Sequence, residues 1–534
     1  MKHTFFVKAS ILLIAINAVA MHGAFAETES LIKEQPHAIY HVVKNKTLQE
    51  ASNQIALRSG IAFQLNAANK NDSITAKLAA ENWQAALAQF LRGYNYTTAS
   101  ANGKIKSVIV TGLNGSGTSN PDAMVAIAPD VMDSLPDQYK NHAPGSVEPI
   151  NLNMDKLKQT PVGKKVTLDL PIGQYTVAHD DYVKHNDGSS TWIGYLDEEG
   201  KAYRVYLSQG DAGLMGNVNT PDGMYTIDTV AGQTYWVDVN RSGQLAGGFH
   251  NDQVSEPLAN AGFDIKTAAA LASNGASALK VKAPRSVVTT VPVVDIMVLY
   301  TTVKQTAAFA RQRLQYLIDV TNKAYKDSKI NIQLRLVHTR ATKYSETASN
   351  DVALSDLSRD RGALAGTSAL RTKYGADLVF LFRPYYRSTH GSCGMTYVGF
   401  STGQSGNPGT AFGTVSDGTS RDNYNLYYCG LQTFAHETGH SLGNVHDRYY
   451  ASFQGKFPYS YAWGIYGKFG TIMSYYSPSL MFYSTPLLKT QCKGGPCGYA
   501  EGNVNSSDQS RTINYTGPIV AGFKPKTTAV PVIQ

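Results

Sequence analysis

Twelve residues in the C-terminal part of the chain constrain its fold more than any other stretch. They read His-Glu-Thr-Gly-His-Ser-Leu-Gly-Asn-Val-His-Asp and occupy positions 436–447. If residues 431–442 form a helix, His436 and His440 lie one turn apart on the same face. Two imidazoles on that face can bind one Zn²⁺, and Glu437 lies on the same side, placed to reach a water molecule on the metal.

Gly443 explains how a third ligand can follow so soon after the helix. His446 comes only three residues later, so the chain must turn sharply, and glycine adopts the required left-handed conformation without a steric clash. Three histidines leave a fourth position for water, as in catalytic rather than structural zinc sites. The alternative is a polar helix with chance histidines, and the complete pattern leaves it little weight.

A second segment, Thr471–Tyr476, contains Met473. The two segments together resemble the metzincin metallopeptidases, in which a methionine-containing turn follows the zinc helix. His446-Asp447 and residues 511–514 resemble the reprolysin-like (ADAM-like) branch more than the serralysin or astacin branches. The resemblance covers roughly the last 240 residues. It implies one catalytic zinc bound by His436, His440 and His446, with Glu437 as general base acting on protein or peptide substrates.

The resemblance also implies roles for three neighbouring residues. Met473 is expected to form an apolar floor under the imidazoles without binding metal, although a core methionine is a close alternative. Asp447 is expected to support the turn through hydrogen bonds. Tyr475 follows Met473 by two positions, as in astacin- and serralysin-type turns, whereas ADAM-type enzymes generally lack it. A fifth ligand, an oxyanion donor and a packed tyrosine all remain open for Tyr475.

Charge and composition narrow the class of protein. The chain has 534 residues, enough for two to four domains. Its net charge is +8, but lysine and arginine are scattered, and no segment reads as a nucleic-acid-binding arm. Charged residues are only 16% of the chain, against ~25% in typical soluble proteins. This composition is typical of a strand- and loop-rich exported protein.

The first 26 residues read as a signal peptide. Lys2 and Lys8 precede an apolar stretch at residues 10–20 that is too short to span a membrane, and Ala24-Phe25-Ala26 forms a cleavage site. An uncleaved anchor is the alternative. We therefore expect an exported protein, secreted or periplasmic in a Gram-negative bacterium, without a membrane span after cleavage.

Four cysteines all lie in the metzincin-like region, at positions 393, 429, 492 and 497. An even number in an exported protein predicts disulfides, with three possible connectivities. Cys492 and Cys497 flank a tight Lys-Gly-Gly-Pro loop, which leaves Cys393 to pair with Cys429. A cysteine zinc site is the competing interpretation, but no second ligand pair has suitable spacing.

Residues 39–112 read as a small α/β module. Strands are expected at residues 41–43, 61–65 and 105–110, with helices at residues 47–59 and 83–91. The pattern resembles the secretin and TonB receptor N-terminal (STN) domain. This implies a Gram-negative envelope protein with an envelope or secretion-system partner. Residues 113–160, which contain a Gly/Ser/Asn-rich stretch and several prolines, are expected to form a linker and connecting segment.

Residues 161–250 alternate as strands, at residues 166–170, 192–196, 203–207 and 225–227. They resemble the β-rich propeptide that precedes reprolysin-like bacterial peptidases. The region has no cysteine, so a propeptide thiolate cannot cap the zinc. His179, Asp180 and Asp181 are alternative zinc ligands for a latent state, or form an exposed polar loop. Residues 251–291 are expected to be a linker with a basic processing site, cut within roughly 280–292.

The catalytic region is expected at residues 292–525, followed by a tail at 526–534. Apolar strands at residues 294–300, 330–337 and 376–382 alternate with helices and predict a mainly parallel sheet. By resemblance, the Phe412 region is assigned as the edge strand that pairs with extended substrate, after a loop at Gly394–Phe400. We thus expect a multidomain α+β protein that acts as a secreted zinc endopeptidase. The alternative is an envelope adaptor built on the STN-like module with a vestigial or auxiliary zinc domain.

Overall fold

The computed structural model of the chain describes residues 39–113, 125–127, 135–246, 252–254, 291–527 and 532–533. Short gaps within these ranges fall at residues 81, 92–93, 102–103, 144–145, 171–172, 222, 241, 243, 402–404 and 423–424. The chain divides into two compact units, residues 1–114 and 115–534. The predicted signal peptide and processing site lie outside the described residues. No helix in the described ranges is long and apolar enough to span a membrane.

The first unit contains every element predicted for residues 39–112 and two more. Its elements are β1 (Ile39–Thr47), α1 (Leu48–Ser59), β2 (Ala62–Leu65), β3 (Ser73–Ala80), α2 (Trp83–Phe90), β4 (Tyr94–Ala101) and β5 (Lys104–Leu113). The capping box of Thr47 and Glu50 begins α1, and Gly60 ends it with a φ of 68°. Strands β3 and β4 were not predicted, because their sequences alternate weakly.

The second unit begins with an antiparallel nine-stranded sheet, in the order β6-β7-β14-β13-β12-β11-β10-β9-β8. The sheet curves so that its first and last strands, β6 and β8, lie next to each other, with Cα atoms within 8 Å. Residues 147–159, expected to be a connecting segment, form β7 and helix α3 here. The elements are β6 (Val125–Ile127), β7 (Val147–Leu152), α3 (Met154–Gln159), β8 (Lys165–Leu170), β9 (Gly173–Lys184), β10 (Ser190–Leu196), β11 (Gly200–Gly210), β12 (Gly213–Thr220), β13 (Gly223–Val230) and β14 (Gln233–Asp238).

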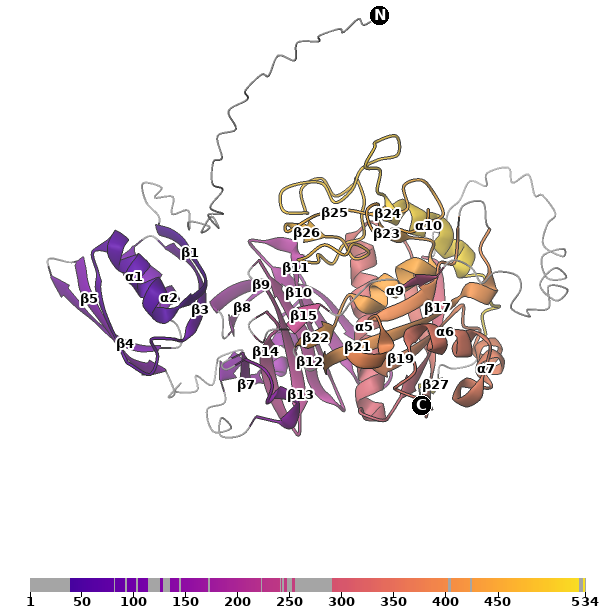
Figure 1. The fold of residues 1–534 in the computed structure, drawn as a ribbon, viewed down its shortest axis with the longest axis horizontal. Coiled ribbons are helices and arrows are strands. Elements are labelled where there is room, and N and C mark those ends of the chain that lie inside the picture. Colours follow the sequence, from indigo (N-terminus) through magenta and orange to yellow (C-terminus); the bar gives the residue numbers. More distant parts are fainter. Residues whose placement is uncertain are drawn as a thin grey trace, which may run out of the picture. The chain divides into compact units, whose positions relative to one another are not determined.

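A second, mainly parallel sheet follows (Figure 1). As predicted from the alternation of apolar strands and helices, β17, β18, β19 and β21 run parallel. The strands are β15 (Gln244–Ala246), β16 (Gln253–Val254), β17 (Val293–Thr301), β18 (Gln333–Thr342), β19 (Leu378–Pro384), β20 (Gly394–Tyr397), β21 (Phe412–Arg421), β22 (Leu426–Cys429) and β27 (Val532–Ile533).

Helices cover both faces of this sheet. Alternate residues of β17 point to opposite sides: Val298 packs in one core with α5 and α9, and Met297 in another with α6 and α7. The main helices are α5 (Ala307–Asp327), α6 (Asn350–Ser358), α7 (Thr367–Tyr374), α8 (Arg387–His390), α9 (Thr433–Ser441) and α10 (Gln509–Val520). The short strands β23 (Val445–Asp447), β24 (Tyr461–Ala462), β25 (Gly464–Ile465) and β26 (Phe469–Gly470) lie between α9 and α10.

Helix α5 carries buried charges that bind the antiparallel sheet to the parallel one. Arg204 of β11 donates to Asp180 of β9 at 2.7 Å and to Asp327 at the end of α5 at 2.9 Å. Lys323 of α5 contacts Asp180 at 2.5 Å. Buried charges are stable only when paired. Separating these two parts of the unit would leave several charged side chains exposed to solvent or without a partner. The antiparallel sheet is therefore firmly docked on the catalytic region.

The edge-strand prediction was wrong. Strand β21, which begins at Phe412, pairs with β19 on one side and with β20 and β22 on the other, so it lies inside the sheet. The segment Gly394–Tyr397, predicted to be a loop, forms the outer strand β20. The sequence Gly-Met-Thr-Tyr is too short to show a strand pattern by itself.

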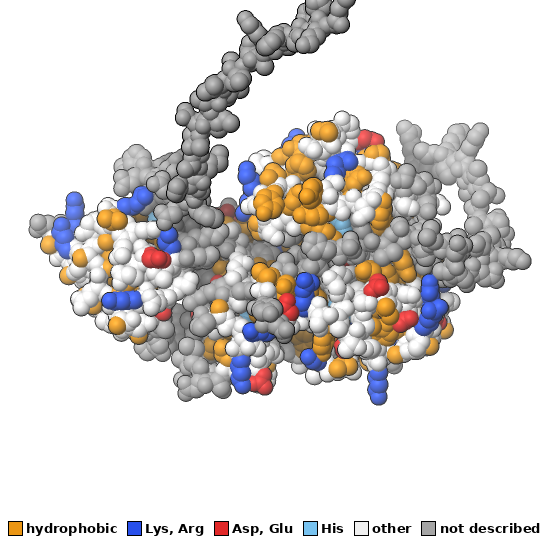
Figure 2. Space-filling model, viewed as in Figure 1, with side chains coloured by type: hydrophobic (Ala, Val, Ile, Leu, Met, Phe, Trp, Pro, Cys, Tyr) orange, Lys and Arg blue, Asp and Glu red, His pale blue; other side chains and the backbone are white. Residues whose placement is uncertain are grey.

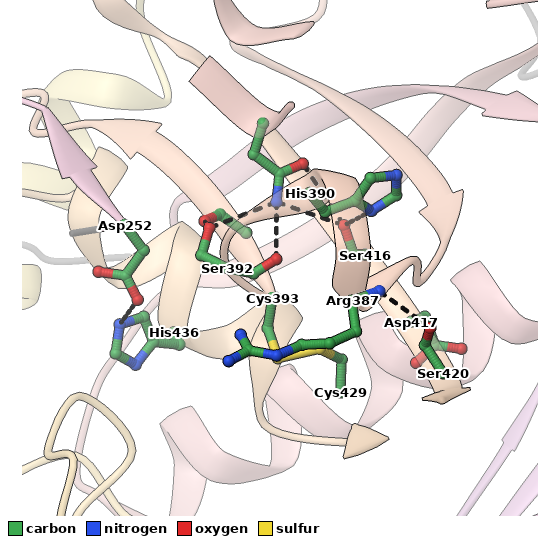
Figure 3. The surroundings of a disulfide bond; sticks show 12 residues. Asp252, Arg387, His390, Ser392, Cys393, Ser416, Asp417, Ser420, Cys429 and His436 are labelled. Carbon is green, nitrogen blue, oxygen red and sulfur yellow. Dashed lines mark hydrogen bonds and ion pairs between the residues drawn. A yellow bond between two sulfur atoms is a disulfide. The ribbon is translucent and has the colours of Figure 1, made fainter. Parts of the chain in front are cut away.

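Both predicted disulfides are present. Cys393 pairs with Cys429, and Cys492 with Cys497. Figure 3 shows the first of these, in which Cys393 immediately precedes β20 and Cys429 ends β22. This bond joins the residue before β20 to the end of β22, and both of these strands pair with β21.

Candidate active site

Three imidazoles converge at the C-terminal end of α9. His436 and His440 lie on one face of this helix, as predicted, and His446 lies on β23. The Nε2 atom of His446 is 3.2 Å from that of His436 and 3.1 Å from that of His440. All three side chains are buried, with at most 1% of their surface exposed.

Backbone carbonyls orient two of these rings. The Nδ1–H of His436 donates to the carbonyl of Ile472 at 2.9 Å, and that of His440 donates to the carbonyl of Asn444 at 3.0 Å. A neutral imidazole carries one proton, so each Nε2 then presents a lone pair to the centre of the site. Burial lowers the pKa of His440, and it lowers the pKa of His446 to about 4. The His440 and His446 rings are therefore neutral at pH 7.

These lone pairs fit a metal cation. Nitrogen lone pairs facing one another at such distances repel unless a positive charge lies between them. Tetrahedral zinc with bonds of about 2.0–2.1 Å holds its ligand atoms roughly 3.3 Å apart, close to the two spacings observed here. The donor set therefore matches a metal site in both chemistry and spacing.

Gly443 makes the third position possible, as expected. Its φ is 86°, and the N–H of Asn444 bonds back to the carbonyl of Gly439 at 3.0 Å, closing the end of the helix. An added Cβ at Gly443 would lie 3.0 Å from the Cβ of Phe400. Both the backbone conformation and the available space therefore favour glycine.

Glu437 lies beside the cluster and is fully buried. Its Oε2 accepts a hydrogen bond from the Thr396 hydroxyl at 2.6 Å, and its Oε1 has no hydrogen-bond partner within the described structure. Burial raises the pKa of this carboxyl well above its usual range, and the nearby charge of Asp252 raises it further. A Cβ at Gly394 would lie 2.4 Å from Oε1. Only glycine at this position therefore lets β20 lie so close to the carboxylate.

The residues expected to support the site lie close to it. The sulfur of Met473 packs so closely on Gly439 that an added Cβ there would lie 2.4 Å away. Asp447 accepts hydrogen bonds from the Ser474 hydroxyl at 3.2 Å and the Tyr475 backbone N–H at 3.3 Å, which joins β23 to the methionine turn. The Tyr475 hydroxyl is 3.0 Å from Nε2 of His446, so this side chain points into the site.

A fourth potential ligand, Asp252, was not predicted. Its carboxylate forms one cluster with the three histidines, in which all the ligand atoms lie within 4.8 Å of one another. Nothing in the surrounding Asn-Asp-Gln sequence distinguishes this residue, and β16 is only two residues long. No local pattern could have identified it, because its place depends on pairing with a distant strand.

The three ligands considered for a latent state lie elsewhere. His179 stacks on Trp192 at 4.8 Å and bonds the carbonyl of Thr160, while Asp180 and Asp181 contact Lys323. None of them belongs to the histidine cluster found in the described part of the chain. The two aspartates serve the contact between β9 and α5, whereas His179 packs within the antiparallel region.

Comparison with known families supports this geometry. Residues 288–503 match the model of metallo-peptidase family M12B, reprolysin-like. Residues 130–242 match the BamI lipocalin-like domain, in agreement with the antiparallel sheet that comes round on itself. Neither match covers half of the chain.

Three curated relatives share the name peptidyl-Asp metalloendopeptidase. The protein from Pseudomonas aeruginosa is 33% identical over 267 residues, which cover 45% of this chain and 41% of that protein. Those from Xanthomonas campestris and Stenotrophomonas maltophilia are each 26% identical, covering 40% of this chain and 46% and 47% of their own lengths. The chain thus spans less than half the length of these relatives. Residues 288–503 are thus similar to the reprolysin-like metallopeptidases of family M12B.

Proposed function

We propose that this protein is a zinc-dependent endopeptidase whose catalytic residues are His436, Glu437, His440 and His446. The observation that carries this proposal is the convergence of three buried imidazoles beside a buried carboxylate. The names of the curated relatives support it. The adaptor alternative is not favoured, because the chain retains every residue that hydrolysis needs.

The chemistry divides between metal and protein. When bound, Zn²⁺ lowers the pKa of a water molecule to roughly 7 and polarises the scissile carbonyl. Glu437 would accept the proton as water attacks and then deliver it to the leaving amine. Its raised pKa and its unpartnered Oε1 suit this exchange, while the Thr396 hydroxyl keeps the carboxylate in position.

Exposed aromatic rings extend outward from the site. Tyr450 lies 5.1 Å from Tyr475 and 4.8 Å from Tyr449 between ring centroids, and the side chains of Tyr449 and Tyr466 are 79% and 85% exposed. Figure 2 shows hydrophobic side chains gathered over the part of this face that carries β25 and β26. These rings offer apolar contacts to a substrate next to the metal.

The relatives' name suggests that Asp marks the cleaved bond. A peptide library digested by the processed enzyme, with products identified by mass spectrometry, tests both activity and preference. We expect cleavage next to Asp, which is lost with a chelator and restored by zinc. Cleavage without regard to Asp would refute only the proposed sequence preference. Absence of cleavage of any peptide would refute the proposed endopeptidase activity.

The Tyr475 hydroxyl is proposed to stabilise the charge that develops on the carbonyl oxygen. It lies 3.0 Å from Nε2 of His446. Loss of one such donor in another protease lowers turnover by ~10²–10³-fold. We expect Tyr475→Phe to lower kcat by ~10²-fold with little change in KM or zinc content, and Tyr515→Phe, at an exposed tyrosine of α10, to have no effect. Unchanged kcat would show that Tyr475 serves packing alone.

The N-terminal region is proposed to be exported and to contain an STN-like module that contacts an envelope or secretion-system protein. The arrangement of two helices with short strands in residues 39–113 is compatible with this role. The proposed domain boundaries follow those set out from the sequence, except that residues 147–159 join the antiparallel region, which is proposed as the propeptide.

A further inference from the structure

Asp252 lies between the lipocalin-like region and the metallopeptidase domain. Before it, β15 pairs in parallel with β22; directly after it, β16 pairs in parallel with the outer strand β20. The backbone N–H of Thr396 donates to the Asp252 carbonyl at 2.9 Å. The strands on either side of Asp252, β15 and β16, therefore both pair with strands of the metallopeptidase domain.

The carboxylate of Asp252 points toward His436 (Figure 3) and belongs to the cluster that the three histidines form. Its Oδ1 lies 2.7 Å from Nε2 of His446, and its Oδ2 lies 3.3 Å from Nε2 of His436. The Tyr475 hydroxyl donates to Oδ1 at 2.7 Å, while Oδ2 has no hydrogen-bond donor among the described residues. A fully buried carboxylate oxygen without a donor, facing three imidazoles, calls for a cation.

We propose that, in the intact chain, Asp252 is the fourth protein ligand of the metal and keeps the enzyme inactive. This inference rests on the metallopeptidase function proposed above. It places an oxygen ligand where catalysis requires water, and a catalytic zinc site needs that position open. It also explains why Glu437 and all three histidines are buried, although an endopeptidase must admit a substrate chain to them.

Asp252 is placed as an inhibitor and not as a substrate. Its side-chain carboxylate faces the metal position, whereas its main-chain carbonyl is turned to Thr396 of β20. The carbonyl that a water molecule would have to attack is thus engaged in a hydrogen bond to β20. The same Thr396 holds the Glu437 carboxylate through its hydroxyl, so one residue positions both the base and the blocking segment.

The disulfide strengthens this arrangement. Strand β22, which holds the segment before Asp252, ends at Cys429, and β20, which holds it afterwards, follows Cys393. The two strands that grip the segment are therefore joined covalently. Cleavage of the chain beyond Val254 would not by itself release Asp252, and activation requires the cut segment to leave both strands.

Binding of a metal-directed probe tests this proposal without relying on activity. The full chain carrying Glu437→Gln, which is not expected to process itself, is loaded with zinc and titrated with a fluorescent peptide hydroxamate. We expect Asp252→Asn or Asp252→Ala in this background to bind the probe at least tenfold more tightly, with one zinc per chain retained. Asp211→Asn, at an exposed aspartate of the same region, is the matched control and should change nothing.

The outcomes separate this inference from the proposed function. Equal probe affinity in all variants, with zinc bound, would overturn the role of Asp252 and leave the metallopeptidase intact. Chains that bind no zinc would overturn both. If the Asp252 variants fail to fold, a measurement on the unsubstituted chain decides the case. When the full chain is loaded with Co²⁺, the relaxation of ¹⁷O-labelled water should reveal no water bound to the metal. A water that exchanges on the metal would contradict the inference.

Discussion

Glu437→Gln should lower peptide hydrolysis by ~10³–10⁴-fold while leaving the fold and about one zinc per chain in place. General acid–base catalysis of this kind contributes ~10²–10⁴-fold. The Asp447 carboxylate also lies close to the site, but it accepts hydrogen bonds from Ser474 and the Tyr475 backbone. Glutamine keeps the size of the side chain and can still contact the Thr396 hydroxyl. It cannot accept the proton of the attacking water.

The measurement compares kcat/KM, zinc content and thermal unfolding of the two proteins after the same processing treatment. Glu501→Gln is a suitable control, because Glu501 is half-exposed and pairs only with the exposed Arg511 among its described neighbours. If Glu437→Gln cleaved peptides as fast as the unmodified enzyme with zinc bound, the mechanism proposed here would be wrong.

Removal of the third histidine should have a still larger effect. We expect His446→Ala in the processed enzyme to lose both metal and detectable hydrolysis. Loss of a supporting hydrogen bond alone typically lowers metal affinity or activity by ~10–100-fold, and loss of a ligand should exceed this. Two histidines on one helix face then remain, too few to hold the ion in an open catalytic site.

Metal analysis after dialysis, together with a zinc titration of activity, measures this outcome. The processed enzyme must be used, because Asp252 can replace the missing ligand in the intact chain. His338→Ala, at a ring that stacks on Tyr374 and lies outside the histidine cluster, is the control and should retain zinc and activity. Full zinc occupancy and normal turnover in His446→Ala would show that the metal is held elsewhere.

Much of the site was predictable because its chemistry is local in sequence. The spacing of His436 and His440 follows from the pitch of one helix, and Gly443 supplies the turn that returns His446. Cys492 and Cys497 are close for the same reason, with only a short loop between them. Apolar runs such as residues 294–300 also predicted the parallel sheet, because a strand buried on both faces needs apolar residues at successive positions.

The tertiary structure decided what depends on contacts between distant segments. Strand β20 is too short to carry a pattern, so its position outside β21 follows only from sheet pairing. Asp180 looked no less suitable than Asp252 as a latent-state ligand, yet Arg204 and Lys323 engage Asp180, while β15 and β16 carry Asp252 to the histidines. Side-chain type and spacing determine which residues can bind a metal. Which distant carboxylate reaches it depends on strand pairing and on competing charges, and neither is written in the local sequence.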